Sequence, residues 1–378
     1  MPHFDYQDEK SAVRSWMFQI KSAFEEQGAE VFFADHYKGK VAKSVSQEKK
    51  TGIVESIKKV MKAWPWFYYS LVYQQYFKQQ DALEKEVLDS FSDLDLVIEF
   101  HTVGSEIGLK LAIKCKAQLS IIWDSPIDEQ FIEMHNTKTI YWNRVCETER
   151  NSLEAAEKIM VYSQACEDYI RSKYKIKAQV NKLPSSLNKP IDKIKRIDDG
   201  NFNIGFIGSF LSWHKLDMLV EVFEKFHARH NDARLILLGF GEEWHRIKEK
   251  ASTMSCADAI EIPGFVSEQQ LVEYKSRFTI ATMPGSNWYG SPLKLFEYSR
   301  AGLPFIAPVS KTVSYIYKEG EHCLFVKEED EYGSLLEALE TMYTDVELRE
   351  RLGRQAQQMI EDRYNRETYY SKLINYLG

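Results

Sequence analysis

The sequence has no apolar stretch that approaches the ~20 residues needed for a membrane-spanning helix. Its first residues, Met1 to Phe4, lead into acidic and polar residues rather than the apolar core of a secretory signal. We therefore expect a cytoplasmic protein that is soluble or at most lies on a membrane surface.

Cysteine is scarce. The five cysteines are odd in number, widely spaced and never arranged as a CxxC pair, which argues against a disulfide framework and a structural zinc site. No other group of His, Cys or carboxylate residues has convincing metal-ligand spacing, so we expect neither a metal nor a cofactor. The cysteines are Cys115, Cys146, Cys166, Cys256 and Cys323.

An excess of positive charge is also missing, because the formal net charge is -7 at pH 7. Proteins that bind nucleic acids generally need a positive surface to neutralise phosphates. We therefore expect no nucleic-acid partner and a smaller ligand instead.

The length of 378 residues exceeds the size at which one hydrophobic core usually stops growing, so two domains are expected. In the second half, strand-like apolar runs alternate with amphipathic helical stretches, which predicts an α/β fold with a parallel sheet. The predicted strands are Ile204 to Ile207, Leu235 to Leu238, Ile260 to Ile262, Phe278 to Ala281, Phe305 to Ala307 and Cys323 to Val326.

The first half repeats this pattern less clearly. We expect an N-terminal domain over residues 1–185, a polar linker from Ser185 to Gly200, a C-terminal domain over 201–360, and a terminal helix within 361–378 that packs back toward the N-terminal domain. The predicted strands are Glu30 to Phe33, Leu94 to Glu99, Leu119 to Ile122, Lys158 to Tyr162 and Ala178 to Leu183.

The start of the chain predicts a missing element. Met1 to Phe4 is typical of the exit from a strand, and Ser11 to Gly28 is typical of the helix that follows one. Since the first strand of a doubly wound sheet is normally central, we expect either a natural start upstream or only a stub of this strand.

Residues 290–302 predict one helix with both ends marked. Ser291 is expected as the N-cap, Pro292 at the first helical position and Gly302 at the C-terminal stop. The amides at such an N-terminus form an anion site, and Gly290 would let a phosphate approach the backbone.

Two charged residues share one face of this helix. Lys294 and Glu297 stand three positions apart, so a cation near a phosphate is followed by a carboxylate able to accept from ribose hydroxyls. This pattern indicates a nucleoside diphosphate site. The alternative is a capped surface helix with an ordinary ion pair.

The run from Ser291 to Pro304 resembles the hallmark segment of the group 1 glycosyltransferases, which have the retaining GT-B fold. Three upstream segments follow in the family's order: Ile204 to Asp217, Leu235 to Glu242 and Ile262 to Val266. The resemblance covers Asn201 to about Gly378. It implies two doubly wound Rossmann-like domains facing a cleft.

The resemblance also implies site residues and an activity. Lys294 and Glu297 are expected to act on the donor, a nucleotide sugar whose sugar would pass to an acceptor hydroxyl with retention. The acceptor would be a glycan or a lipid-linked molecule. The further donor-binding residues implied are Gly208, Ser209, His214, Lys215, Gly239, Gly241, Phe265, Val266, Tyr289, Gly290, Ser291, Pro292 and Leu293.

Some positions depart from the family's pattern. Tyr289 stands where a second Glu is usual, and Ser209 and His214 occupy places that often carry Arg and Lys. Lys294 is therefore expected to carry most of the positive charge, with Lys215 adjacent to the first loop. A non-catalytic subunit or glycan-binding partner of the same fold is the alternative function, and an epimerase is a third.

In the first half, the resemblance is limited to three short runs. Trp123 stands where family members often have a His, and Asp124 follows it. Asp124 could orient the acceptor hydroxyl or take its proton, or it could instead cap the next helix. His101 is either a site residue or a structural histidine, and Asp93-Leu94-Asp95 is interpreted as a solvated strand entry and not as a metal-binding DxD.

A basic segment precedes an aromatic one. Lys38 to Lys62 holds eight lysines and two glutamates, and eight aromatic residues follow between Trp64 and Phe77. Such a segment can rest on an anionic membrane surface. Alternatively, the aromatics pack against their own sheet while the lysines are solvated.

Overall fold

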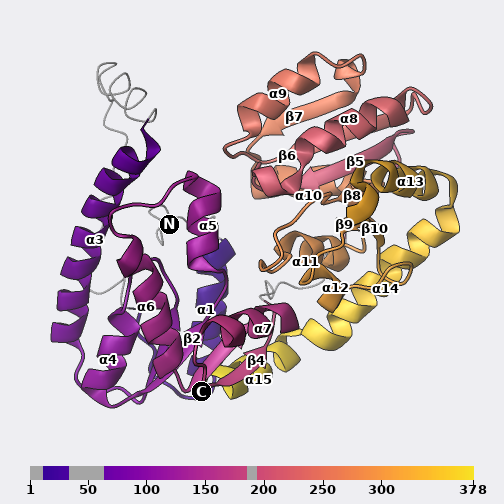
Figure 1. The fold of residues 1–378 in the computed structure, drawn as a ribbon. Helices are drawn as coiled ribbons and strands as arrows, with labels where there is room; N and C mark the ends of the chain where they lie inside the picture. Colours follow the sequence, from indigo (N-terminus) through magenta and orange to yellow (C-terminus); the bar gives the residue numbers. More distant parts are fainter. Residues whose placement is uncertain (1–11, 34–63, 185–193) are drawn as a thin grey trace. The chain divides into compact units, whose positions relative to one another are not determined.

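The computed structural model describes residues 12–33, 64–184 and 194–378, and the chain divides into two compact units (Figure 1). The first unit comprises residues 1–184 together with 370–378, and the second comprises residues 185–369. The chain therefore passes from one unit to the other twice.

The first unit alternates strands with helices over its described residues. Its strands are β1 (Leu96–Phe100), β2 (Gln118–Ile122), β3 (Lys158–Val161) and β4 (Gln179–Lys182). Its helices are α1 (Ala12–Glu25), α3 (Pro65–Ser90), α4 (Ile107–Cys115), α5 (Ile127–His135), α6 (Trp142–Ala155) and α7 (Gln164–Lys173).

The four strands form one parallel sheet in the order β1-β2-β3-β4, with Phe100 opposite Ile122. Parallel neighbours need crossover connections, and helices α4 to α7 provide them. The strands predicted from Leu94 to Leu183 are confirmed, with ends shifted by one or two residues.

The strand predicted at Glu30 to Phe33 is wrong. This segment is irregular, and the carbonyl of Val31 accepts from Lys21 Nζ at 2.9 Å rather than from a neighbouring strand. Phe32 and Phe33 contact the rings of Phe91 and Phe18. The three apolar residues Val31, Phe32 and Phe33 therefore anchor a loop here, because no described strand pairs with it.

The second unit contains a larger sheet. Its strands are β5 (Phe202–Ile207), β6 (Ala233–Leu238), β7 (Ile260–Gly264), β8 (Ile280–Thr282), β9 (Phe305–Pro308) and β10 (Leu324–Val326). Its helices are α8 (Leu216–His227), α9 (Trp244–Ser252), α10 (Glu268–Arg277), α11 (Leu293–Arg300), α12 (Val313–Ile316), α13 (Glu331–Thr344) and α14 (Val346–Tyr364), with short 3-10 turns η2 (Ser212–His214), η3 (Ala257–Ala259) and η4 (Glu328–Asp330).

The strand order β10-β9-β8-β5-β6-β7 is that of a doubly wound sheet, and every pairing is parallel. From β5 the chain first builds outward to β6 and β7, and then returns to β8 on the other side of β5. Strands β5 and β8 are neighbours, and the loops that follow them lead away in opposite directions. In open α/β sheets, ligands bind at such a switch point, outside the carboxyl ends of the strands.

Helix α8 shows why the sequence forms this layer. Leu216, Leu219, Val220, Phe223 and Phe226 recur at helical spacing, and all are buried in the core of the second unit. The opposite face carries charged residues. Burying these five side chains gives roughly 1.5–3 kcal/mol each in transfer free energy, which holds α8 to the sheet.

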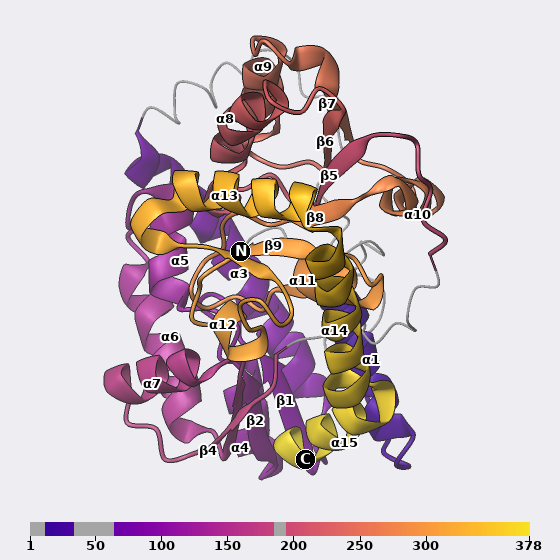
Figure 2. The same ribbon diagram turned by 90° about the vertical axis from the view of Figure 1, so that its right-hand side faces the viewer.

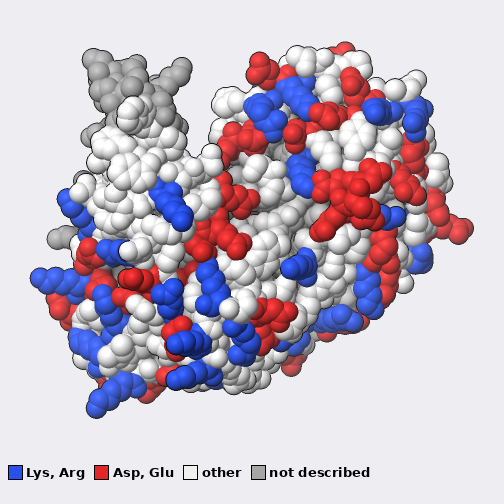
Figure 3. Space-filling model, viewed as in Figure 1, with Lys and Arg blue, Asp and Glu red and all other residues white. Residues whose placement is uncertain are grey.

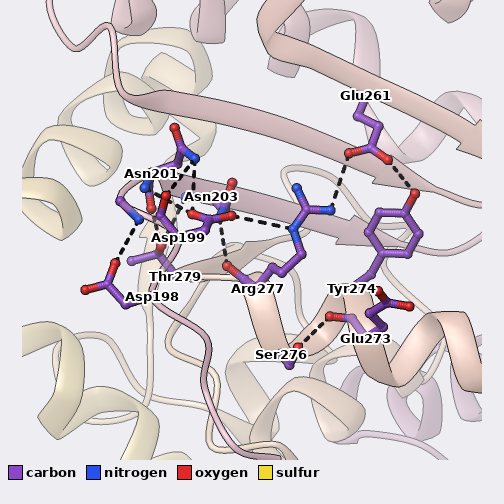
Figure 4. A network of polar contacts seen from close by, with 11 residues as sticks. Asp198, Asp199, Asn201, Asn203, Glu261, Glu273, Tyr274, Ser276, Arg277 and Thr279 are labelled. Carbon is purple, nitrogen blue, oxygen red and sulfur yellow. Dashed lines mark hydrogen bonds and ion pairs between the residues drawn. The ribbon is translucent and has the colours of Figure 1, made fainter.

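A polar network lies at the amino ends of strands in this sheet (Figure 4). Asp199 accepts hydrogen bonds from the Asn201 amide and from Asn203 Nδ2, each at 3.0 Å, and lies 3.5 Å from Arg277 Nε. Asn203 is the second residue of β5, and Arg277 is the last residue of α10. The network therefore fixes the amino ends of the strands, away from their carboxyl ends.

Helix α15 (Arg366–Leu377) closes the chain (Figure 2). Tyr369, Leu373 and Leu377 are fully buried, as the helical spacing predicted. Within the first unit, the Leu377 carbonyl accepts hydrogen bonds from Gln118 Nε2 at 3.0 Å and from Ser120 Oγ at 2.5 Å. The last nine residues thus complete the first unit.

Neither disulfides nor long apolar helices contribute to the described parts of the chain. All five cysteines are free thiols, and none of the described helices is long and apolar enough to cross a membrane. On the face shown in Figure 3, basic and acidic side chains are interspersed over both units.

Candidate functional site

Helix α11 begins one residue later than the sequence predicted. It starts at Leu293, and the N-cap position belongs to Pro292 and not to Ser291. The Pro292 carbonyl accepts from the amides of Leu295 and Phe296, at 2.9 and 3.3 Å. Gly302, at φ +60°, follows the helix as expected, and the Leu303 amide donates to Tyr298 O behind it.

Lys294 lies directly over the end of β5. A Cβ placed on Gly208 would be 1.9 Å from Lys294 Cε, so a larger residue there would displace the end of the lysine side chain. The φ of Gly208 is +150°, which also favours glycine. The sequence predicted both residues in the donor site, and the structure brings them into contact although 86 positions separate them.

The imidazole of His214 holds the end of this lysine. His214 is buried and follows the β5 loop in η2. Its Nε2 lies 2.8 Å from Lys294 Nζ, and its Nδ1 lies 3.0 Å from the carbonyl oxygen of Gly285 in the loop after β8. His214 thereby joins the two diverging loops at the switch point.

Burial shifts the pKa values of both groups downward. Desolvation lowers the pKa of Lys294 to about 8, although the Glu297 charge opposes the shift. Desolvation and the neighbouring Lys294 charge lower the pKa of His214 to about 3. At pH 7 the lysine is therefore the cation and the histidine is neutral. The Phe206 ring, 5.9 Å from Nζ, adds a cation–π contact.

Glu297 stands on the next turn of α11 and is half-buried. Within the described residues, its carboxylate has no hydrogen bond or ion pair, including none to Lys294 three positions earlier. The helix therefore does not carry the ordinary surface ion pair that was the alternative interpretation. The carboxylate oxygens are left to accept hydrogen bonds from a ligand.

Glycines allow the loops of this edge to pack closely. A Cβ on Gly239 would be 1.9 Å from the Gly208 carbonyl oxygen, and one on Gly241 would be 2.5 Å from that of Phe210. The Gly239 amide donates to Gly264 O at 2.9 Å. The loops after β5, β6 and β7 are thus held together by backbone contact, which explains why small residues recur there.

The remaining donor-site candidates differ in their surroundings. Ser209 and Phe265 are exposed, whereas Val266 packs against the core. Tyr289 is only 3% exposed and its ring contacts that of Trp288. The Gly290 amide donates to Asn287 Oδ1 at 2.8 Å. Tyr289 is therefore a packing residue of the loop after β8.

Lys215 takes part in a different contact. It adopts φ +52°, a left-handed conformation that non-glycine residues rarely adopt, and its ammonium pairs with the carboxylate of Glu331 at the start of α13. Sequence reasoning could not detect this pairing, since the partners lie 116 positions apart. It also missed Phe206 and Gly285, whose roles depend on Lys294 and His214.

In the first unit, Asp124 lies at the carboxyl end of β2. Helix α5 starts at Ile127 with Pro126 as its N-cap and without a side-chain cap bond, so Asp124 does not cap it. Asp124 Oδ1 accepts from Ser125 Oγ at 3.1 Å. Desolvation raises the pKa of Asp124 to about 6, while this hydrogen bond and the charge of His101 oppose the shift.

His101 and Trp123 support this edge from within. His101 Nδ1 lies 3.1 Å from Glu99 Oε1. Burial lowers the pKa of His101, but Glu99, Glu149 and Asp124 together raise it above its ordinary value. Trp123 is fully buried and its Nε1 donates to Glu149 Oε1 at 2.9 Å. Trp123 is thus a structural residue, whereas His101 Nε2 is buried and unpartnered.

No metal site is evident in the parts of the chain that the structure describes. No group of three or more His, Cys, Asp or Glu side chains there is arranged to hold an ion. Within the described residues, the groups near the carboxyl ends of β5 and β8 that can bind a ligand are the Lys294 ammonium, the Glu297 carboxylate and backbone amides. Such a set suits an anionic organic ligand with hydroxyl groups.

Two units, each with a parallel α/β sheet, are typical of the GT-B fold. Residues 188–359 match the model of the family described as Glycosyl transferases group 1. An uncharacterized glycosyltransferase of Haemophilus influenzae is 23% identical over 213 residues. The match spans 56% of this chain and 58% of that protein, which is less than two thirds of its length.

Several solved structures share the fold. WaaG, a glycosyltransferase involved in lipopolysaccharide biosynthesis, is similar with a TM-score of 0.65 and 13% identity over 97% of this chain and 96% of its own. HepE of Anabaena, solved with UDP-glucose, has a TM-score of 0.61 with 13% identity and coverages of 78% and 81%. TarM of S. aureus, solved with UDP, has a TM-score of 0.59 with 16% identity and coverages of 73% and 54%.

Proposed function

We propose that the protein is a glycosyltransferase that moves a sugar from a nucleotide-sugar donor to an acceptor hydroxyl with retention at the anomeric carbon. The observation that carries the proposal is the pairing of Lys294 with the end of β5, beside an unengaged Glu297 on the same helix. The family match of residues 188–359 and the nucleotide complexes of HepE and TarM support it.

The donor is proposed to lie along the carboxyl edge of the second sheet. Lys294 and the amides at the start of α11 meet the diphosphate, and Glu297 accepts hydrogen bonds from the ribose. The base lies by the exposed Phe265 in the loop after β7. As the glycosidic bond breaks, negative charge grows on the diphosphate, and a fixed cation stabilises it without a metal ion.

The acceptor is proposed to be handled by the first unit. The carboxyl ends of β1 and β2 place His101 and Asp124 side by side, because the His101 amide donates to Ile122 O at 3.2 Å. A carboxylate with a pKa of about 6 is largely ionised at pH 7 and can orient a hydroxyl or accept its proton.

A membrane-bound acceptor would suit the start of α3. Trp64, Trp66, Phe67 and Leu71 are between 42% and 74% exposed, and no charged residue occurs from Pro65 to Phe77. The lysine-rich stretch within Lys38 to Lys62 lies outside the described residues. We propose that an anionic, cytoplasmic membrane face is the partner of this segment, through its lysines and exposed aromatics.

The aromatics of α3 nevertheless do not all face outward. Tyr73 and Phe77 are buried in a cluster with Val103, Phe131 and Val145, so they pack against α5, α6 and the loop after β1 and not against the sheet. Packing and exposure therefore belong to different turns of the same helix. Only its first turns are available to a membrane.

Two measurements test the proposed activity. Thermal-shift and calorimetric titrations with UDP, GDP, ADP and their sugars should identify one nucleotide that stabilises the protein. A radiolabelled sugar of that nucleotide should then be transferred or hydrolysed. A folded protein that binds none of these nucleotides would contradict the proposal and favour a non-catalytic subunit of the same fold.

A further inference from the structure

We propose that His214 is a positioning residue that keeps the Lys294 ammonium over the end of β5 as the single cation of the diphosphate site. The proposal rests on the function proposed above. It adds a role for His214 that acts through the lysine, without a contact between the imidazole and the nucleotide.

The two contacts of the imidazole fix its tautomer. Gly285 O can only accept, so His214 Nδ1 must carry the hydrogen that points to it at 3.0 Å. Nε2 is then a lone-pair acceptor, and the group that it faces at 2.8 Å is an ammonium, which can only donate. The arrangement needs no rotation of either side chain, and it requires a neutral histidine that accepts from the Lys294 amine.

The surroundings make the reverse charge assignment unfavourable. His214 is 5% exposed, and desolvation together with repulsion by the Lys294 charge lowers the pKa of His214 to about 3. Among the described residues, the site therefore has one cation, Lys294. A second basic side chain at position 214 would add charge, whereas His214 is a hydrogen-bond acceptor that orients the Lys294 ammonium.

Few other ionisable groups bear on Lys294. Glu297 of α11 is the carboxylate whose charge affects it. Lys215, at the start of α8, is paired with Glu331 of α13. Strand β5 contributes only the Phe206 ring and Gly208. The charge of the site consequently depends on one titration, that of Lys294, whose pKa lies near 8.

A pH dependence of binding follows. Nucleotide affinity should fall as the pH rises above about 8, because the free protein then loses its cation. A bound diphosphate favours the ammonium form, so binding above this pH should take up a proton from the buffer. Below pH 7, His214 stays neutral and the lysine stays charged, so affinity should be level until the nucleotide itself titrates.

Three variants test the role of His214. His214→Phe removes the acceptor and keeps a buried ring, whereas His214→Gln retains both an acceptor for Lys294 and a donor for Gly285 O. Lys294→Met keeps the stem and removes the charge. Affinity for the tightest binder among UDP, GDP and ADP is measured by calorimetry at pH 7 for each variant and for the double variant of His214→Phe with Lys294→Met.

His214→Phe should weaken binding roughly tenfold, as expected when a hydrogen bond to a charged group is lost, and His214→Gln should restore most of it. In the Lys294→Met background, His214→Phe should have no further effect. Equal losses from His214→Phe in both backgrounds would show that the imidazole contacts the nucleotide itself, and would overturn the proposal.

A second measurement does not involve nucleotides. Competitive labelling of lysines with acetic anhydride over a pH series, followed by mass spectrometry of the Lys294 peptide, gives the apparent pKa of this amine. It should lie near 8 in the natural protein and lower in His214→Phe. If no nucleotide binds, the proposed function fails, but the labelling experiment still tests whether His214 positions Lys294. An unchanged pKa in His214→Phe would overturn the positioning role.

Discussion

The hydroxyl of Tyr298 accepts a hydrogen bond from the backbone amide of Ile207 at 3.0 Å. Tyr298 is a residue of α11, one turn after Lys294, and Ile207 is the last residue of β5. This buried bond fixes the distance between the helix that carries the charged residues and the strand end over which Lys294 lies.

Tyr298→Phe should therefore loosen the site. It leaves the Ile207 amide without a partner, which costs about 1–3 kcal/mol of stability. Nucleotide affinity should fall as well, because α11 is no longer tied to β5. Urea unfolding and calorimetric titration measure the two effects.

Asp199→Ala is the matched control for this change. It breaks the network at the amino ends of the strands of the same sheet. Burial raises the pKa of Asp199, but hydrogen bonds such as that from Asn203 lower it below its ordinary value near 4. The loss of stability should therefore be greatest above pH 4. Stability should fall by about 1–2 kcal/mol with unchanged affinity. If both variants lost affinity equally, destabilisation alone would explain the effect of Tyr298→Phe.

Glu297→Gln should separate ligand binding from folding. The substitution keeps the shape of the side chain but weakens charge-assisted hydrogen bonds, each worth ~1.5–3 kcal/mol, so nucleotide affinity should fall roughly tenfold to a hundredfold. The melting temperature should hardly change, since the carboxylate has no hydrogen bond within the described residues. Unchanged affinity would refute the assignment of Glu297 to the ribose.

Lys294→Ala should reduce turnover more than ground-state nucleotide affinity. The cation matters most where negative charge develops, which is on the leaving diphosphate. Steady-state rates with a nucleotide sugar, compared with the affinity for the matching nucleoside diphosphate, give the two quantities. A loss of affinity with an unchanged maximal rate would place the role of Lys294 in binding alone.

Asp124→Asn should slow transfer and stabilise the fold at pH 7. Because desolvation raises the pKa of Asp124 from 3.8 to about 6, the folded state holds this proton more tightly than the unfolded state, and stability falls as the pH rises from about 4 to about 6. Removing the charge should add on the order of 1 kcal/mol at pH 7, after allowance for partial exposure, and almost nothing at pH 4.

The rate of the natural protein should rise with pH through about 6, if ionised Asp124 serves the acceptor. Asp124→Asn should remove this limb and reduce the rate roughly a hundredfold or more. An Asp124→Asn protein of full activity would remove this residue from the mechanism, whatever its stability.

Membrane association can be tested by charge. Replacing Lys49, Lys50, Lys58 and Lys59 with Gln should release the protein from anionic vesicles, since each charge contributes up to ~1 kcal/mol near the surface. The same four-charge change at the exposed lysines of the second unit, Lys225, Lys248, Lys318 and Lys327, is the control and should have little effect. Equal sedimentation of the natural protein and both variants would rule out the proposal.

Strands and their order of appearance were predictable because parallel α/β sheets give near-continuous apolar runs. The six strands of the second unit are confirmed within two residues. Val31, Phe32 and Phe33 also form a short apolar run, yet they form no strand, because such a run also suits a loop that packs aromatic rings. Strand formation depends on a neighbour, which composition does not reveal.

Within the candidate site, motif spacing identified Gly208, His214, Lys294 and Glu297 but not their contacts. The hydrogen bond between His214 and Lys294 joins residues 80 positions apart, and only the topology of the sheet brings them together. The start of α11 was misplaced for a local reason, since Pro292 can occupy either the N-cap or the first helical turn. The burial of Tyr289 likewise depends on tertiary packing.

The position of residues 370–378 has a consequence for synthesis on the ribosome. These residues belong to the first unit, and the carbonyl of Leu377 bonds to Gln118 and Ser120 on β2. They are translated after all of the second unit, so β2 emerges long before its partner does. On the ribosome, the first unit therefore cannot be completed before the second unit has been synthesised. Until then, Gln118 and Ser120 of β2 lack their hydrogen bonds to the Leu377 carbonyl.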